Sequence, residues 1–140
     1  MSALEPVARQ TLQREETPNP LPLAAAAIHN KRWADALPLA KAALQREESF
    51  EAWVLCGIAQ ARLKDLREAI TCFQKALEKK PSDLQTWVDL GECSLGINDF
   101  QRAGMALGRA IDLDPNGTHP AGRRARVLAG RAIVKLRNNK

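Results

Sequence analysis

Two stretches of this chain, Trp53-Val54-Leu55-Cys56-Gly57 and Trp87-Val88-Asp89-Leu90-Gly91, begin thirty-four residues apart and share tryptophan, valine and glycine at matching places. The match continues downstream, where each tryptophan is followed at offsets of 16, 20, 23 and 28 residues by three apolar residues and a proline. These residues are Ala69, Phe73, Ala76 and Pro81 in the first copy, and Ala103, Leu107, Ala110 and Pro115 in the second. Self-similarity at a fixed period of this length predicts a repeat architecture.

A period of 34 residues with the pattern W-x₂-L-G, then A-x₃-F and then proline resembles the tetratricopeptide repeat family. The resemblance implies an all-α fold of three tandem helix-turn-helix repeats, at residues 17–49, 50–83 and 84–117, stacked into a right-handed superhelix. The first of these repeats is the weakest, as is common for a terminal repeat. An array of this kind has no chemistry of its own and holds another chain, so we expect no enzymatic activity and no cofactor.

The bulk composition agrees with a single helical unit inside a cell. The chain has 140 residues and 45% hydrophobic content, without the period-2 alternation of strands or an apolar run long enough to span a membrane. Three cysteines, Cys56, Cys72 and Cys93, form no pair with metal-ligand or redox spacing. His29 and His119 stand apart from any nucleophile or carboxylate cluster. We therefore expect a cytoplasmic protein without a metal site.

The residues flanking the repeats differ in character. Residues 1–16 are expected to form a flexible or short-helical arm, and residues 17–137 a single domain. Residues 118–137 predict a capping helix over the third repeat, with its arginines facing away from the protein. Its apolar stripe has helical spacing and comprises Ala121, Ala125, Leu128, Ala132 and Leu136.

Local signals predict where the repeat helices begin, end and cross. Ser49, Asp65 and Asp99 are expected N-caps, and Gly96 is expected to end a helix in the left-handed conformation. Within each repeat the two helices should cross where small residues meet. The expected crossings are Gly57 with Ala69 and Gly91 with Ala103.

The positive charge is concentrated at one end of the sequence. Residues 118–140 carry seven Lys or Arg and no acidic residue, while the whole chain has a net charge of +5. The simplest interpretation is a solvated outer face, and an acidic protein partner is the next. Nucleic acid is the least favoured partner because no aromatic residues interleave the arginines. We expect no membrane partner, and a homodimer stays open.

In the family that the chain resembles, positions 2, 5, 9 and 12 of the first helix of each repeat line the concave face. Carried onto this sequence, those positions imply a peptide groove that is largely apolar with acidic spots, unless the N-terminal arm covers part of it. We expect Val54, Ile58, Val88 and Leu95 to be partly exposed there. The predicted peptide-binding residues are Leu21, Ile28, Val54, Ile58, Val88 and Leu95 in apolar pockets, with Glu51, Gln85 and Glu92 as polar contacts.

One subtype of the family is excluded, because this chain lacks the cations that the subtype uses. Members that grip the C-terminal carboxylates of heat-shock chaperones use Lys, Asn and Arg at five positions of the groove. The residues at those positions here are Leu21, Ala25, Leu55, Gln85 and Asp89. No cation is available for a carboxylate, and Asp89 would repel one.

The chain also resembles a narrower group, the bacterial type III secretion chaperones that hold translocator proteins. The resemblance rests on the overall plan of arm, three repeats and charged last helix, on residues 91–95 and 99–103 of the third repeat, and on residues 125–136. It implies a chaperone that binds an extended apolar segment of a secreted translocator in the concave groove. A general scaffold that bridges subunits of another assembly is the alternative.

Overall fold

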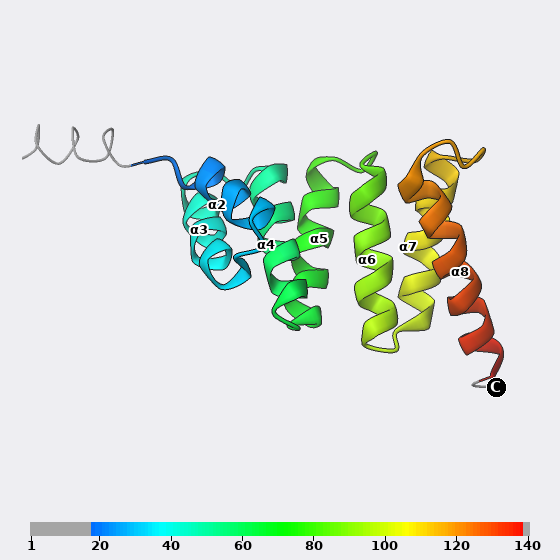
Figure 1. The fold of residues 1–140 in the computed structure, drawn as a ribbon. Helices are drawn as coiled ribbons and strands as arrows, with labels where there is room; N and C mark the ends of the chain where they lie inside the picture. The colour runs from blue at the N-terminus through cyan, green and yellow to red at the C-terminus, as the bar shows by residue number, and fades with distance from the viewer. Residues whose placement is uncertain (1–17, 139–140) are drawn as a thin grey trace, which may run out of the picture.

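The computed structural model describes residues 18–138, so the expected arm at residues 1–16 lies outside the described residues. Seven α-helices and no strand make up this part of the chain, and they follow one another side by side in chain order (Figure 1). The all-α prediction of three helix pairs and a capping helix is therefore confirmed. The helices are α2 (Pro20–His29), α3 (Trp33–Arg46), α4 (Phe50–Arg62), α5 (Leu66–Lys79), α6 (Leu84–Gly96), α7 (Phe100–Leu113) and α8 (Pro120–Asn138).

Side chains cap the helices where the sequence predicts them to begin. Ser49 accepts a hydrogen bond from the Ala52 backbone N–H at the start of α4, and Asp65 accepts one from Glu68 at the start of α5. Asp99 does the same for α7. Each cap satisfies a backbone donor that has no partner within its own helix, which fixes the first residue of that helix.

The turn inside each repeat uses the same backbone conformation in all three copies. Lys31, Lys64 and Asn98 have φ values of 58°, 72° and 63°, and they occupy the same position of their repeats. The prediction for Gly96 was wrong, since it is the last residue of α6 and the left-handed residue is Asn98. Position 96 favours glycine for another reason, because a Cβ there would stand 2.5 Å from Cδ1 of Leu66 on α5.

The two helices of a repeat approach most closely at a glycine, but the partner is larger than predicted. A Cβ at Gly57 would lie 2.6 Å from Cε1 of Phe73, and one at Gly91 would lie 2.5 Å from Cγ of Leu107. The glycines therefore accommodate the large side chains of the facing helix. The predicted partners Ala69 and Ala103 are fully buried, but they are not the atoms nearest to the glycines.

Helix α8 completes the core at the C-terminal end of the stack. Its predicted apolar stripe is confirmed, because Ala121, Ala125, Leu128 and Ala132 are buried and Leu136 is half-buried. The cluster that they form with α6 and α7 includes Val88, which is fully buried. The prediction of an exposed Val88 was wrong: α8 packs on α6 and covers this side chain.

The arginines of α8 do not all face away, as predicted. Arg126 is half-buried and donates hydrogen bonds to the backbone carbonyls of Asp114, Pro115 and Gly122. Arg123 donates to the carbonyls in the loop just before α8, whose Asp114 carboxylate also accepts backbone hydrogen bonds from Thr118 and His119. These arginines hold the connection between α7 and α8.

The first helices of successive repeats are not evenly packed. Helix α2 packs on α4, and α6 packs on α8, but α4 and α6 make almost no contact with each other. The second and third repeats are joined instead through α5, which packs on both α4 and α6. The stack is therefore open on one side at this junction. None of the helices in residues 18–138 is long and apolar enough to cross a membrane.

Candidate functional site

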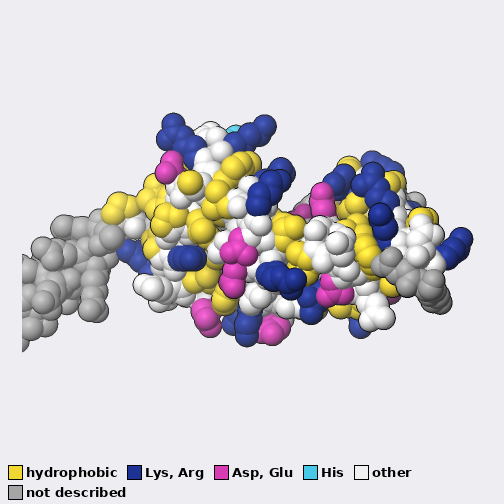
Figure 2. All heavy atoms as spheres, turned by 90° about the horizontal axis from the view of Figure 1, so that it is seen from below, with side chains coloured by type: hydrophobic (Ala, Val, Ile, Leu, Met, Phe, Trp, Pro, Cys, Tyr) yellow, Lys and Arg dark blue, Asp and Glu magenta, His cyan; other side chains and the backbone are white. Residues whose placement is uncertain are grey.

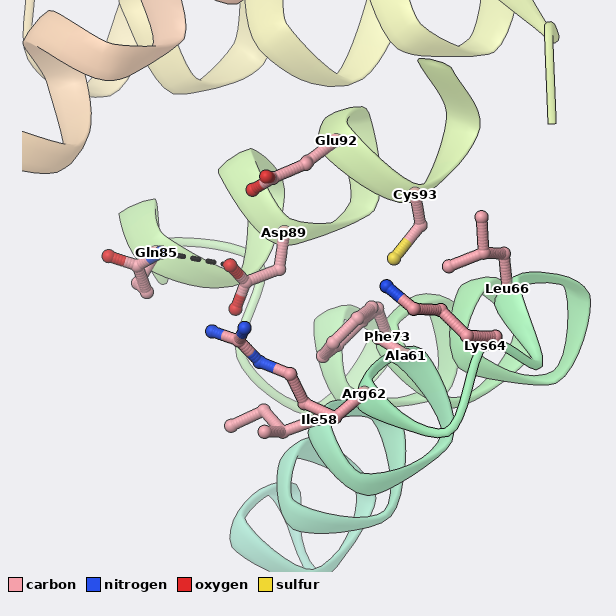
Figure 3. A pocket seen from close by; sticks show the side chains of 10 residues that line it. All are labelled: Ile58, Ala61, Arg62, Lys64, Leu66, Phe73, Gln85, Asp89, Glu92 and Cys93. Atoms are coloured by element: carbon pink, nitrogen blue, oxygen red, sulfur yellow. Dashed lines mark hydrogen bonds between the residues drawn. The ribbon is translucent and has the colours of Figure 1, made fainter. Parts of the chain in front are cut away.

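A pocket of about 490 Å³ lies where α4 and α6 diverge (Figure 3). Its apolar lining comes from both repeats, with Ile58 and Ala61 on α4, Leu66 and Phe73 on α5, and Cys93 on α6. Phe73 is buried and belongs to the core cluster that joins the two repeats. The bottom of the pocket is thus the edge of the hydrophobic core, where Ile58, Ala61 and Leu66 are only half-buried because α4 and α6 stand apart.

Charged and polar side chains line the rest of the pocket. Arg62, the last residue of α4, and Lys64 in the following turn lie on one side, while Gln85, Asp89 and Glu92 project from α6 on the other. Figure 2 shows the same combination on a wider scale, with hydrophobic side chains between charged ones on one face and an indented outline between its two halves. An apolar floor rimmed by charged side chains is typical of a surface that binds another protein or a ligand.

Asp89 is a carboxylate of this pocket whose pKa is shifted from its ordinary value. Burial raises its pKa to about 6, against a hydrogen bond from Gln85 and the charge of Arg62, both of which lower it. Gln85 Nε2 donates to Asp89 Oδ1 over 2.9 Å. Within residues 18–138, no Lys or Arg nitrogen lies within 4.0 Å of this carboxylate, the limit for a salt bridge. Asp89 is therefore a half-buried acid without a paired cation.

The raised pKa gives a testable effect of pH on stability. The folded protein holds the Asp89 proton more tightly than the unfolded chain, because the folded-state pKa of about 6 lies above the ordinary value of 3.8. Protonated Asp89 therefore favours the folded state, and this contribution to stability is fully present below pH 3.8 and lost as pH rises through about 6. At pH 8 the Asp89→Asn variant should be more stable than the parent by about 1–2 kcal/mol, a figure reduced for partial exposure. The difference should shrink at pH 4.5, as measured by urea unfolding.

Glu51→Gln is the matched control, because it removes the same charge from an exposed position on α4. Surface substitutions of this kind stay within about 0.5 kcal/mol. If Asp89→Asn has no stabilising effect at pH 8, the carboxylate is not desolvated as its burial implies.

The structure gathers only part of the predicted peptide-binding set at this pocket. Ile58, Gln85 and Glu92 line it, while Leu95 and again Glu92 line a second pocket between α6, α7 and α8. Val88 is buried in the core and cannot touch a ligand. The remaining predicted residues line neither pocket: Leu21, Ile28 and Val54 are half-buried, and Glu51 is exposed.

Sequence reasoning missed three polar residues of the pocket as contributors, namely Arg62, Lys64 and Asp89. Their signal was present, since Asp89 is one helical turn from Gln85 on α6, and Arg62 is one turn from Ile58 on α4. Residues three or four apart share a helix face, so the predicted positions carry these neighbours into the same pocket. Lys64 could not be found in this way, because its place depends on the left-handed turn after α4.

Comparisons with known proteins agree with this architecture. The tetratricopeptide repeat family model matches residues 50–83, the second helix pair. An 80-residue part of the chain is 34% identical to the human superkiller complex protein 3, although that part covers 56% of this chain and only 5% of the human protein. The family model thus matches one helix pair, and the 34-residue repeat pattern and the fold of residues 18–138 agree with that match.

Two solved structures illustrate the shared fold. The type III secretion chaperone SycD of Yersinia enterocolitica, in complex with a peptide of the translocator YopD, superimposes with a TM-score of 0.76 at 16% identity, over 90% of this chain and 95% of that one. The TPR2B-domain:pHsp70 complex of yeast Sti1 gives a TM-score of 0.72 at 21% identity, over 80% and 91%. At these identities the likeness establishes the fold.

Proposed function

We propose that this protein binds an extended segment of a client protein along α4 and α6. An apolar side chain of the client enters the pocket above Ile58 and Phe73, and a basic side chain lies beside Asp89. Leu21, Ile28, Val54 and Glu51 extend the contact toward the first repeat. In its specific form, the protein is a cytoplasmic chaperone that masks an apolar segment of a secreted translocator until export.

The observation that carries the proposal is the unpaired Asp89 beside an open apolar floor. A half-buried carboxylate without a salt bridge lowers the stability of the free protein at neutral pH, as its raised pKa implies. A basic side chain of a client would supply the missing charge and recover that energy on binding. The apolar floor would supply affinity, since burying one large aliphatic side chain contributes about 1.5–3 kcal/mol.

The relatives support both levels of the proposal. One structure of the same fold is a type III secretion chaperone in complex with a translocator peptide, and another is a domain in complex with pHsp70. A scaffold role is the second candidate. It is favoured by the 34% identity over 80 residues to a protein named as a component of a complex. A scaffold would use the same groove for a permanent subunit and not for a secreted client.

The test is the binding of three fluorescent peptides of equal length, in which leucine alternates with arginine, glutamate or serine. The leucine–arginine peptide should bind, and Ile58→Arg should weaken it at least about tenfold, because the new side chain fills the pocket and repels the peptide. Fluorescence anisotropy measures the binding, and a thermal melt establishes that the variant is folded.

Met105→Arg is the matched control, since it makes the same kind of change at an exposed apolar residue of α7 that lines neither pocket. It should leave binding intact. Undiminished binding of the leucine–arginine peptide by a folded Ile58→Arg protein would exclude this pocket as the site.

A further inference from the structure

A second pocket, of about 310 Å³, lies between α6, α7 and α8, next to the first one. Leu95, Phe100 and Leu128 supply its apolar lining, one from each of the three helices. Arg131 and Lys135, one turn apart on α8, bring two positive charges to it. The pocket therefore pairs an apolar floor with cations, whereas the first pocket has two cations, Arg62 and Lys64, facing the carboxylates of α6.

The acidic residue of this second pocket already has a partner. Glu92 Oε1 lies 2.6 Å from Nη2 of Arg124, an ion pair that joins α6 to α8 at the border between the two pockets. With Glu92 neutralised, Arg131 and Lys135 determine the charge of the second pocket. The surrounding sequence strengthens it, because residues 118–140 contain no Asp or Glu. Lys and Arg side chains lie at this end of the molecule in Figure 2, as they do elsewhere on this face.

Outside the pocket, α8 continues the same mixture of apolar and basic groups. The side chains of Val127 and Val134 are 60% and 51% exposed, well above the exposure of side chains that pack against another helix. Together with Arg131 they stand at i, i+4 and i+7, which places all three on one face of α8. Among the described helices none packs beyond α8, so this face ends the stack uncovered.

We propose that the second pocket and the adjoining face of α8 bind an acidic segment of a partner protein, with one apolar side chain of that segment seated between Leu95 and Leu128. Charge complementarity selects the partner, since every formal charge of α8 is positive and Glu92 is compensated. A second copy of this chain would bring the same positive charge and be repelled. A single strand of nucleic acid would find only one aromatic side chain in this pocket, Phe100, and none on α8 on which successive bases could stack.

The proposal extends the proposed function, because Glu92 borders both pockets, but a different probe tests it. The leucine–glutamate peptide should bind the parent protein, more weakly as salt rises from low to high concentration. The double variant Arg131→Glu, Lys135→Glu should weaken that binding at least about tenfold. The matched control, Lys79→Glu with Arg109→Glu, reverses two exposed charges away from both pockets and should bind like the parent.

The outcomes separate the two pockets. Ile58→Arg should leave the leucine–glutamate peptide bound, and the Arg131→Glu, Lys135→Glu variant should leave the leucine–arginine peptide bound. The proposal is overturned if the leucine–serine peptide binds as well as the leucine–glutamate peptide, or if both double variants lose binding equally. It is also overturned if the parent binds vesicles of phosphatidylcholine with phosphatidylglycerol, or single-stranded DNA, in a manner sensitive to Arg131 and Lys135 while the acidic peptide does not bind.

Discussion

Val88→Asp is expected to unfold the repeat domain, whereas Val54→Asp leaves it folded. The two valines occupy the same position of successive repeats, but Val88 is fully buried against α7 and α8 while Val54 is half-buried and outside the core clusters. An unpaired carboxylate at Val88 costs several kcal/mol. Small domains have only about 5–15 kcal/mol of stability in total.

Urea unfolding followed by circular dichroism distinguishes the two variants. Val54→Asp should lower the free energy of unfolding by about 1 kcal/mol, a typical value for a partly exposed site. Val88→Asp should lack a cooperative transition or lose most of its stability. Equal losses for the two variants would mean that α8 does not cover the third repeat as the contacts of Val88 imply.

Gly91→Leu has the second largest expected effect, a loss of about 1–3 kcal/mol or more from overpacking. Even the Cβ of the new residue would stand 2.5 Å from Cγ of Leu107, so α6 and α7 must separate or Leu107 must leave its place. Leu107 is fully buried and has little room to move. The midpoint of a thermal melt should fall accordingly.

Gly108→Leu is the matched control on the facing helix. A Cβ at Gly108 meets no atom within 4 Å, so the substitution should stabilise α7 by about 0.5–1 kcal/mol through helix propensity alone. The two glycine replacements are thus expected to have opposite signs. A stabilising Gly91→Leu would contradict the close approach of α6 and α7.

The sequence was sufficient to predict the architecture because local and periodic signals agree. The repeated tryptophans, the caps at Ser49, Asp65 and Asp99 and the stripe on α8 all point to the same helices, and the structure has them. Such agreement across levels is typical of sequences that specify one fold.

The site was predicted less well, because it depends on spacing between helices and not on helix periodicity. Val54 and Val88 occupy the same position of successive repeats, but Val54 is half-buried and Val88 is covered. The reason is that α8 packs beside α6, whereas α4 and α6 lie apart. The same separation opens the pocket that exposes Asp89. Arg126 was misplaced for a related reason: its partners are backbone carbonyls of the preceding loop, which no side-chain pattern encodes.

Binding of a client between α4 and α6 is tested most directly by a titration of the isotopically labelled protein with the leucine–arginine peptide, followed by nuclear magnetic resonance. We expect the largest amide and methyl shift changes to cluster at Ile58, Ala61, Gln85 and Asp89, on the facing sides of α4 and α6. The Asp89 carboxyl carbon should also report a pKa below its free-protein value of about 6 once the basic peptide is bound. Shift changes confined to α3, α5 and α7, with Asp89 unchanged, would contradict binding between α4 and α6.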